Sequence, residues 1–467
     1  MVGRQARRAR RIGAGHVVVI GAGFAGLLAA RVLSEHAERV TLVERDRLPA
    51  EPDVRPGVPQ GRHVHALLES GQRALEELLP GVLAELDGHG APRLGMPDEL
   101  LYWQDGRWYR RTPASTHVYT GRRAQVEWLV RRRVCADGRV TVVGGTEVRG
   151  LLGDASRVRG VLLRERGAGA EGTSQPLAAD LVVDASGRGS RAPVWLVALG
   201  AEAPREERLD TGLAYATRVY RATEEGAPEA PRGYYLLPSP EQTRSGVVVP
   251  VGDDLHLVTL SGLRDYQPPT DPAEFEAFAQ RLPHPVIGDW MARAKPESGV
   301  FGFRGTVNVR LRYDRRGRRP EGFLATGDAL CAFNPIYGQG MSVAALNALA
   351  LRDALANPHR SSRTLNVQRA VARSSRQAWD ISTGADRNMP GAEGDVARGG
   401  MADRVASWYL GRVQARAPGD PVVGDAFRAV LGLTAPLSAL FAPAVARAAL
   451  FGRVRETPDG PPPRPEA

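Results

Sequence analysis

Cysteine and lysine are both scarce in this chain of 467 residues, and each scarcity carries information about the class of protein. The two cysteines, Cys135 and Cys331, are too few for a disulfide framework or a four-cysteine metal site. Lys295 is the single lysine, so every other basic residue is arginine. This bias, together with 53 Gly and 35 Pro, is typical of a GC-rich coding sequence rather than of a basic binding face. The scarcity of cysteine predicts a reducing, cytoplasmic setting.

Long apolar runs are also missing. No stretch approaches the roughly 18 uninterrupted apolar residues of a membrane-spanning helix, which excludes an integral membrane segment. Part of the net charge of +10 lies at the N-terminus, where five arginines and no acid occur among the first eleven residues. No nucleic-acid-binding module accompanies that charge, and no long apolar region of a signal peptide follows it. We predict a disordered basic tail over residues 1–12 and no nucleic-acid partner.

A nucleotide-binding unit follows the tail. A buried strand at His16–Ile20 leads into a glycine turn, an apolar-periodic helix over Leu27–Leu33 and a second strand at Val40–Val43. In such a turn the first glycine makes the tight bend, and the second lets the backbone approach a pyrophosphate. The third lets the helix pack on the strand. These three glycines are Gly21, Gly23 and Gly26.

Glu44 directly follows the second strand, where a carboxylate can accept a hydrogen bond from a ribose 2′-hydroxyl. Because a carboxylate repels a 2′-phosphate, this site is expected to prefer FAD or NAD over NADP. A second glycine motif, Gly167 to Gly172, leads into Thr-Ser-Gln-Pro instead of an apolar helix. We interpret it as the loop of a β-hairpin and assign it no ligand.

The remaining patterns predict a discontinuous nucleotide-binding domain with a sheet inserted into it. Strand-like runs divided by Gly, Pro and Asp turns, from about Gly212 to Gly262, predict an antiparallel sheet. The predicted segments are a nucleotide-binding domain in three parts (13–100, 121–205 and 305–360), a substrate-side insertion (101–120), a β-sheet substrate domain (206–304), C-terminal helices (361–455) and a disordered tail (456–467). Within them we predict helices at Val64–Leu79, Ala124–Val134 and Gln339–Ala356 and a strand at Gly305–Tyr313.

Two strand ends further along the chain carry an acid. Asp184 ends one apolar strand, and Gly327-Asp328 follows another. Pro335-x-x-Gly338-x-Gly340 then opens a long helix. An aspartate at a strand end can hydrogen-bond a ribityl hydroxyl, and a helix N-terminus suits the negative charge of a reduced flavin.

The glycine turn, Glu44, Arg123, Asp184, the Gly-Asp pair and the Pro-x-x-Gly-x-Gly segment resemble the FAD-dependent monooxygenases of the para-hydroxybenzoate-hydroxylase type. The resemblance covers the chain to about Ala356. It implies an α/β fold: a Rossmann-like FAD-binding domain of the GR2 type, an inserted antiparallel β-sheet substrate domain and a C-terminal helical region. It also implies FAD as cofactor, NAD(P)H as transient electron donor and O2 as co-substrate. The cofactor-binding residues expected from it are Gly21, Gly23, Phe24, Ala25, Gly26, Glu44, Arg45, Arg62, Arg123, Val148, Asp184, Gly327, Asp328, Pro335, Gly338, Gly340 and Met341.

A narrower likeness lies in the segment Val-Pro-Gln-Gly-Arg62-His63-Val-His65, which is similar to one in bacterial polyether-pathway polyene epoxidases. Tyr215-Ala-Thr-Arg218 and Thr306-Val-Asn308 look like further parts of those enzymes. They add oxygen to carbon–carbon double bonds of a polyketide chain through a C4a-hydroperoxyflavin. The likeness implies an epoxidase of secondary metabolism and antibiotic biosynthesis, acting on an apolar polyene or aromatic small molecule.

No catalytic base identifies itself in the sequence. The candidates near the flavin are Arg62, His63, His65, Pro335 and Tyr337. The two histidines are two positions apart and have no further ligands at suitable spacing, so we predict no metal site. Arg62 fits a loop over the flavin, and it also fits a helix cap paired with a surface acid.

Several other functions stay open at this point. Phenol hydroxylases of the same fold are helped by a His, Tyr or Arg that deprotonates the substrate. Flavin-linked prenyl reductases share the glycine turn and the Gly-Asp pair. Flavin halogenases fit less well, because their Trp-x-Trp-x-Ile-Pro segment is absent and Lys295 lies outside the early region of their catalytic lysine. A flavin-binding accessory protein is the non-enzyme alternative, and no oligomeric state follows from the sequence.

Overall fold

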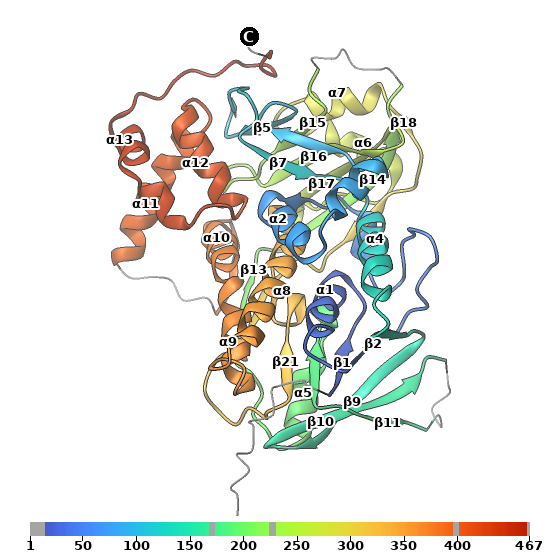
Figure 1. The fold of residues 1–467 in the computed structure, drawn as a ribbon. Helices are drawn as coiled ribbons and strands as arrows, with labels where there is room; N and C mark the ends of the chain where they lie inside the picture. Colours follow the sequence, from blue (N-terminus) through green and yellow to red (C-terminus); the bar gives the residue numbers. More distant parts are fainter. Residues whose placement is uncertain (1–14, 168–172, 224–229, 396–400, 465–467) are drawn as a thin grey trace, which may run out of the picture.

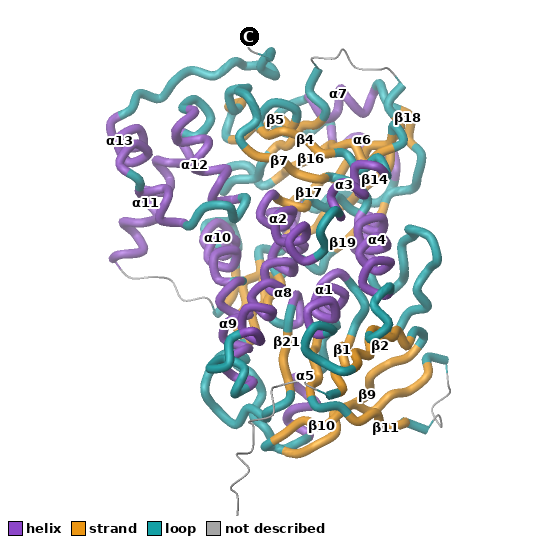
Figure 2. Tube along the Cα trace, in the orientation of Figure 1, coloured by secondary structure: helices purple, strands orange, loops and turns teal. Residues whose placement is uncertain are grey.

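The structure is a computed structural model of the chain, described here for residues 15–167, 173–223, 230–395 and 401–464. The predicted basic tail, residues 1–12, lies outside the described residues. So do residues 168–172 of the second glycine motif and residues 465–467 at the C-terminus. Figure 1 shows the course of the chain, and Figure 2 shows where its helices and strands lie.

A five-stranded parallel sheet forms the centre of the nucleotide-binding part, with the strand order β21-β12-β1-β2-β8. Its strands are β1 (His16–Ile20), β2 (Arg39–Val43), β8 (Val140–Val143), β12 (Leu181–Asp184) and β21 (Phe323–Ala325). Every residue of β1 is buried, so both faces of the strand are covered. The helices that pack together beside this sheet are α1 (Phe24–Leu33), α4 (Arg123–Cys135) and α8 (Gly340–Ala356).

A separate three-stranded antiparallel sheet contacts β2 and β12. It consists of β9 (Thr146–Asp154), β10 (Arg157–Glu165) and β11 (Gln175–Ala178). β10 pairs antiparallel with β11, so the strands on either side of the second glycine motif are arranged as the arms of a hairpin.

The inserted sheet has eight strands and lies above the nucleotide-binding part in Figure 1. The strands are β5 (Leu100–Gln104), β6 (Arg107–Trp108), β14 (Leu213–Arg221), β15 (Gly233–Leu236), β16 (Arg244–Gly252), β17 (Leu255–Leu263), β18 (Lys295–Pro296) and β19 (Phe301–Phe303). Its pairs are antiparallel except for β5 with β15. Helices α6 (Pro272–Ala279) and α7 (Val286–Ala292) share a buried apolar cluster with it. The predicted fold class is confirmed.

Two small sheets connect these parts. One consists of β3 (Leu67–Leu68), β7 (Thr116–Tyr119) and β4 (Arg93–Met96), the other of β22 (Cys331–Ala332), β20 (Asn308–Leu311), β13 (Glu206–Asp210) and β23 (Glu393–Gly394). They correct two predictions. The helix expected from Val64 begins only at Glu69, because the two preceding leucines pair with β7. The strand expected over Gly305–Tyr313 is limited to the four residues of β20.

Helices α2 (Glu69–Leu78) and α3 (Val82–Gly88) follow β3, and α5 (Ala192–Ala198) follows β12. The C-terminal helices are α9 (Thr364–Ser374), α10 (Arg376–Asp386), α11 (Met401–Arg416), α12 (Pro421–Leu431) and α13 (Pro443–Phe451). The last three share their own apolar cluster, at the left of Figure 1. Beyond them, within the tail predicted to be disordered, Arg464 donates hydrogen bonds to the carboxylate of Asp98. Among the described residues, no helix is both long and apolar enough to cross a membrane.

Candidate functional site

One large cavity of about 620 Å³ lies where the parallel sheet, α1, α8 and the inserted sheet meet. Such a volume is within the range of small-molecule and cofactor sites. The candidate residues that line it are Gly21, Gly23, Phe24, Ala25, Glu44, Arg45, His65, Arg123, Val148, Gly327, Asp328, Pro335, Gly338, Gly340 and Met341. The structure therefore brings together residues that are up to 320 positions apart in the sequence.

The turn between β1 and α1 forms one end of the cavity. Gly21 has φ +96°, a conformation that side chains other than glycine rarely adopt. A Cβ atom on Gly26 would lie 1.9 Å from the carbonyl oxygen of Gly21, so the third glycine lies behind the turn and allows close packing. Phe24 and Ala25 begin α1 and line the cavity, so the free amides and positive dipole of this helix terminus face it.

Glu44 is held rigidly at the end of β2. One carboxylate oxygen accepts the amide N–H of Ala22 at 2.8 Å, and the other accepts that of Asp46 at 3.1 Å. The side chain is buried, yet it lines the cavity. Because a carboxylate has about four acceptor positions, Glu44 can still accept a ribose hydroxyl.

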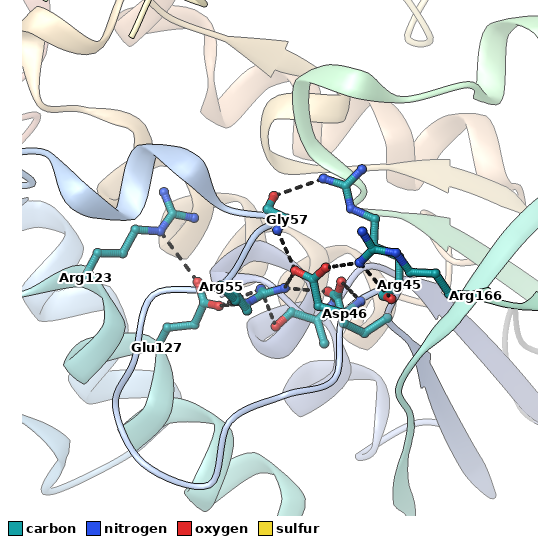
Figure 3. A network of polar contacts seen from close by, with 9 residues as sticks. Arg45, Asp46, Arg55, Gly57, Arg123, Glu127 and Arg166 are labelled. Carbon is teal, nitrogen blue, oxygen red and sulfur yellow. Dashed lines mark hydrogen bonds and ion pairs between the residues drawn. The ribbon is translucent and has the colours of Figure 1, made fainter. Parts of the chain in front are cut away.

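The central cation of this end is Arg55, which the sequence-based prediction missed (Figure 3). Its guanidinium lies 3.0 Å from Glu44, 3.5 Å from Asp46 and 2.6 Å from Glu127 of α4. Burial lowers the pKa of Arg55, but Glu127 and Glu44 outweigh burial and leave that pKa raised. The arginine therefore stays charged and neutralises a group of buried carboxylates beside the cavity.

Arg123 begins α4 and continues this network toward the inserted sheet. Its Nε lies 3.5 Å from Glu127, and its Nη1 lies 3.2 Å from Nε2 of His65. His65 Nδ1 lies 3.0 Å from the carbonyl oxygen of His63. A carbonyl can only accept, so Nδ1 carries the proton and Nε2 accepts from Arg123. Burial and then Arg123 lower the pKa of His65 to about 3, which makes the ring neutral at pH 7.

Asp328 lines the middle of the cavity, and its carboxylate forms an ion pair with Arg188 at 3.6 Å. Arg188 also lines the cavity and was not predicted, although it belongs to the Asp-Ala-Ser-Gly-Arg segment. The neighbouring amide of Gly327 donates to Asn347 of α8 at 3.2 Å, which fixes the Gly-Asp turn.

Asp184 was expected to contact the cofactor, but it does not line the cavity. Its carboxylate is fully buried and accepts hydrogen bonds from the amide and hydroxyl of Ser186 and the hydroxyl of Ser190. Burial raises its pKa. The side chain thus shapes its own turn, and the following residues Ala185 to Gly187 reach the cavity in its place.

The Pro-x-x-Gly-x-Gly segment forms a short 3₁₀ turn (η5, Pro335–Tyr337) and the start of α8. Asn334 caps the turn by accepting the amide of Ile336, and Gly338 ends it in a left-handed conformation. Gly340 and Met341 open α8 and line the cavity. A second helix N-terminus therefore faces the same cavity.

Besides Gly26 and Asp184, the structure places three further candidate residues outside the cavity wall. Arg62 is exposed, with its guanidinium 4.5 Å from the ring centre of Phe301. His63 is buried behind the wall, bonded to Thr217 at 2.8 Å, and burial lowers its pKa to about 4. Tyr337 turns away and donates its hydroxyl to Asp386.

The residues present fit FAD. Two helix N-termini face the cavity, an acid fixed by backbone amides lies at one end, and a Cβ atom on Gly340 would have open space around it. Gly23, Phe24 and Glu44 would hold the adenosine diphosphate half, and Asp328, Pro335 and Gly340 the ribityl and ring half. Within the described ranges, no group of three His, Cys, Asp or Glu side chains is arranged to hold a metal ion.

Comparisons with known proteins agree with this fit. Residues 15–382 match the FAD binding domain family. The chain is 33% identical over 410 residues to the protein Rv3254 of Mycobacterium tuberculosis, covering 84% of this chain and 83% of that protein. Its fold is similar to that of the flavin-dependent brominase Bmp2, with 17% identity, a TM-score of 0.65 and coverage of 93% of this chain and 98% of that one. It is also similar to p-nitrophenol 4-monooxygenase PnpA from Pseudomonas putida, with 18% identity, a TM-score of 0.62 and coverage of 90% and 98%. The chain therefore belongs to the FAD binding domain family, with FAD as its cofactor, and shares the fold of those flavin-dependent proteins.

Proposed function

We propose that this enzyme is a monooxygenase that uses NAD(P)H and O2 to epoxidise carbon–carbon double bonds of an apolar, polyene-like molecule. When bound, FAD supplies the reduction and activation of O2. The protein binds and orients the two partners and excludes water from them. The likeness of the Arg62–His65 segment to polyene epoxidases supports this assignment.

The wall contributed by the inserted sheet supports an apolar substrate. Tyr215 of β14 stacks on Phe303 of β19, with ring centres 5.2 Å apart and 30° between the planes. Both residues line the cavity, together with Val64, Ala66 and Phe333. Burial raises the pKa of Tyr215, so its hydroxyl stays protonated and neutral. An extended apolar chain can lie against this wall with little loss of solvation.

The observation that carries the proposal is that His63, His65 and Tyr337 are each engaged by a neighbour and titrate away from neutral pH. His65 accepts from Arg123, and its pKa is about 3. His63 lies behind the wall with a pKa of about 4. Burial, followed by Asp386, raises the pKa of Tyr337 well above its ordinary value. Oxygen transfer to an alkene requires no base at the reacting carbons, whereas phenol hydroxylation is helped by one.

The test is oxygen transfer from labelled O2 to an isolated alkene, compared with transfer to a phenol, followed by product mass analysis. Epoxide formation is expected in the wild type and in His63→Ala and His65→Ala. Tyr215→Phe is the matched control, because it keeps the ring and removes only the hydroxyl. Phenol turnover that collapses with either histidine, without alkene turnover, would contradict the proposal. Alkene saturation without O2 would indicate a prenyl reductase instead.

Aromatic hydroxylation is the second candidate, because the Tyr215–Phe303 pair can also pack against an aromatic ring. Halogenation has less support. Lys295, the single lysine, lies on β18 with 70% of its side chain exposed, beside Glu297, and it is not a lining residue of the cavity. Oxygenated product that is unchanged by added bromide or chloride would exclude that reaction.

A further inference from the structure

The segment Asn334–Gly338, called here the flavin loop, is held from three separate parts of the chain. Tyr235 of the inserted sheet donates its hydroxyl to the carbonyl of Ile336 at 2.6 Å. Gln339, next to the loop, donates to the carbonyl of Leu431 at the end of α12. The third anchor comes from the end of α10, where Asp386 reaches the loop directly.

Asp386 is a buried carboxylate surrounded by neutral donors. One oxygen accepts the Tyr337 hydroxyl at 2.6 Å. The other accepts the side-chain amide of Asn334 at 3.0 Å and that of Asn308 at 2.5 Å. Asn308 in turn accepts the backbone amide of Asn334 at 2.8 Å and the hydroxyl of Ser382 at 2.7 Å. Asp386 and Asn308 therefore fix both the backbone and the side chain at the start of the loop.

The position of this loop sets the ring end of the cavity. Asn334, Pro335 and Gly338 line the cavity, and α8 begins two residues after Gly338. A shift of the loop would therefore move both the cavity wall and the free amides of the α8 terminus.

We propose that Asp386 is the positioning residue that holds the flavin loop against FAD, which gives α10 of the C-terminal region a role in cofactor binding. The inference rests on FAD binding and on no particular substrate. A carboxylate suits this position because its two oxygens offer acceptor sites for three converging donors. An asparagine would offer one oxygen and would turn an amide group toward one of those donors.

The experiment compares Asp386→Ala, Asp386→Asn and Tyr337→Phe with the wild type. FAD affinity is measured by titrating the apoprotein, the visible circular dichroism of bound FAD reports its environment, and the Tm of the apoprotein reports folding. We expect the FAD Kd to rise about ten-fold or more in Asp386→Ala and about three-fold in Tyr337→Phe, with an altered dichroism spectrum. Asp386→Asn should fall between the wild type and Asp386→Ala, because it keeps one acceptor.

Asp380→Asn is the matched control. Asp380 lies on the same helix, but it is exposed and pairs with Arg376, so its removal should leave the Kd within two-fold. The Asp386 variants could instead lower the Tm of the apoprotein while leaving the FAD Kd and the dichroism spectrum as in the wild type. That result would show that Asp386 acts only in folding, and it would overturn the proposal. An equal loss of affinity in Asp380→Asn would also overturn it. If Asp386→Ala does not fold, Asp386→Asn and Tyr337→Phe decide the question by the same criteria.

Discussion

The two ends of the cavity stabilise buried carboxylates in different ways. At the β1–α1 end, Glu44 and Glu127 are compensated by the positive charge of Arg55. At the α8 end, Asp386 accepts hydrogen bonds from Asn308, Asn334 and Tyr337, which are neutral.

This difference has consequences for stability and for pH. A compensated group keeps its charges across the physiological range, but the removal of one partner leaves uncompensated charge in the interior. A carboxylate held by neutral donors is more easily protonated, so its environment responds to pH. The first end therefore depends on charge balance, and the second on hydrogen-bond geometry. Four measurements can test this contrast.

The largest effect is expected for Arg55→Ala. The substitution leaves Glu44, Asp46 and Glu127 buried without their shared cation, so the free energy of unfolding should fall by about 3–5 kcal/mol. FAD binding should weaken with it, because Arg55 lines the cavity and its loss leaves uncompensated negative charge beside the cofactor. Chemical denaturation of the apoprotein and FAD titration measure the two effects. Arg376→Ala, which removes an exposed i,i+4 pair, is the control and should cost about 0.5 kcal/mol or less. Similar losses in both variants would contradict a charge-compensated end.

Asp328→Ala tests the stretch of cavity between the two ends. If Asp328 hydrogen-bonds the ribityl chain, FAD affinity should weaken by about 1–3 kcal/mol, the value of a hydrogen bond to a charged group. Asp353→Ala, on the exposed side of α8, should leave affinity unchanged. An unaltered FAD Kd in Asp328→Ala would show that the Gly-Asp turn does not contact the cofactor.

The pH dependence of stability distinguishes the α8 end. Burial raises the pKa of Asp386, so the folded protein keeps its proton at pH values where the unfolded chain has lost it. Stability from this group is therefore greatest at low pH and declines as pH rises from about 4 through the raised pKa. The Tm of the wild type minus that of Asp386→Asn should fall over this range. A difference that rises with pH would reverse the sign and contradict the assignment.

The smallest effect is an expected absence of titration. Because the pKa values of His63 and His65 are about 4 and 3, neither ring should titrate between pH 6 and 8. The rate of flavin reduction by NAD(P)H should therefore show no inflection near pH 6.5 in the wild type. His65→Gln should give the same pH profile as the wild type. Such an inflection in the wild type would mean that burial and Arg123 do not keep the His65 ring neutral.

Local patterns were sufficient to predict much of the nucleotide-binding part. The prediction of β1 and the glycine turn is confirmed because each depends on neighbouring residues: an apolar run for the strand, and glycine at the position with φ +96°. The start of α2 was missed because Leu67 and Leu68 pair with a strand about fifty residues away, and no local signal records that pairing.

By itself, the sequence therefore determined the fold class and placed Gly21, Gly23, Glu44 and Asp328, which line the cavity. Only the tertiary structure decided which further charged residues lie at or near the cavity. Arg55, Arg188 and Asp386 lie in segments whose local sequence is compatible with exposure, and distant elements bury them or bring them to the cavity. The tertiary structure also placed Arg62, His63 and Tyr337 outside the cavity wall, because side-chain direction depends on packing between elements. Backbone conformation follows from neighbouring residues, whereas the environment of a charge depends on the whole folded chain.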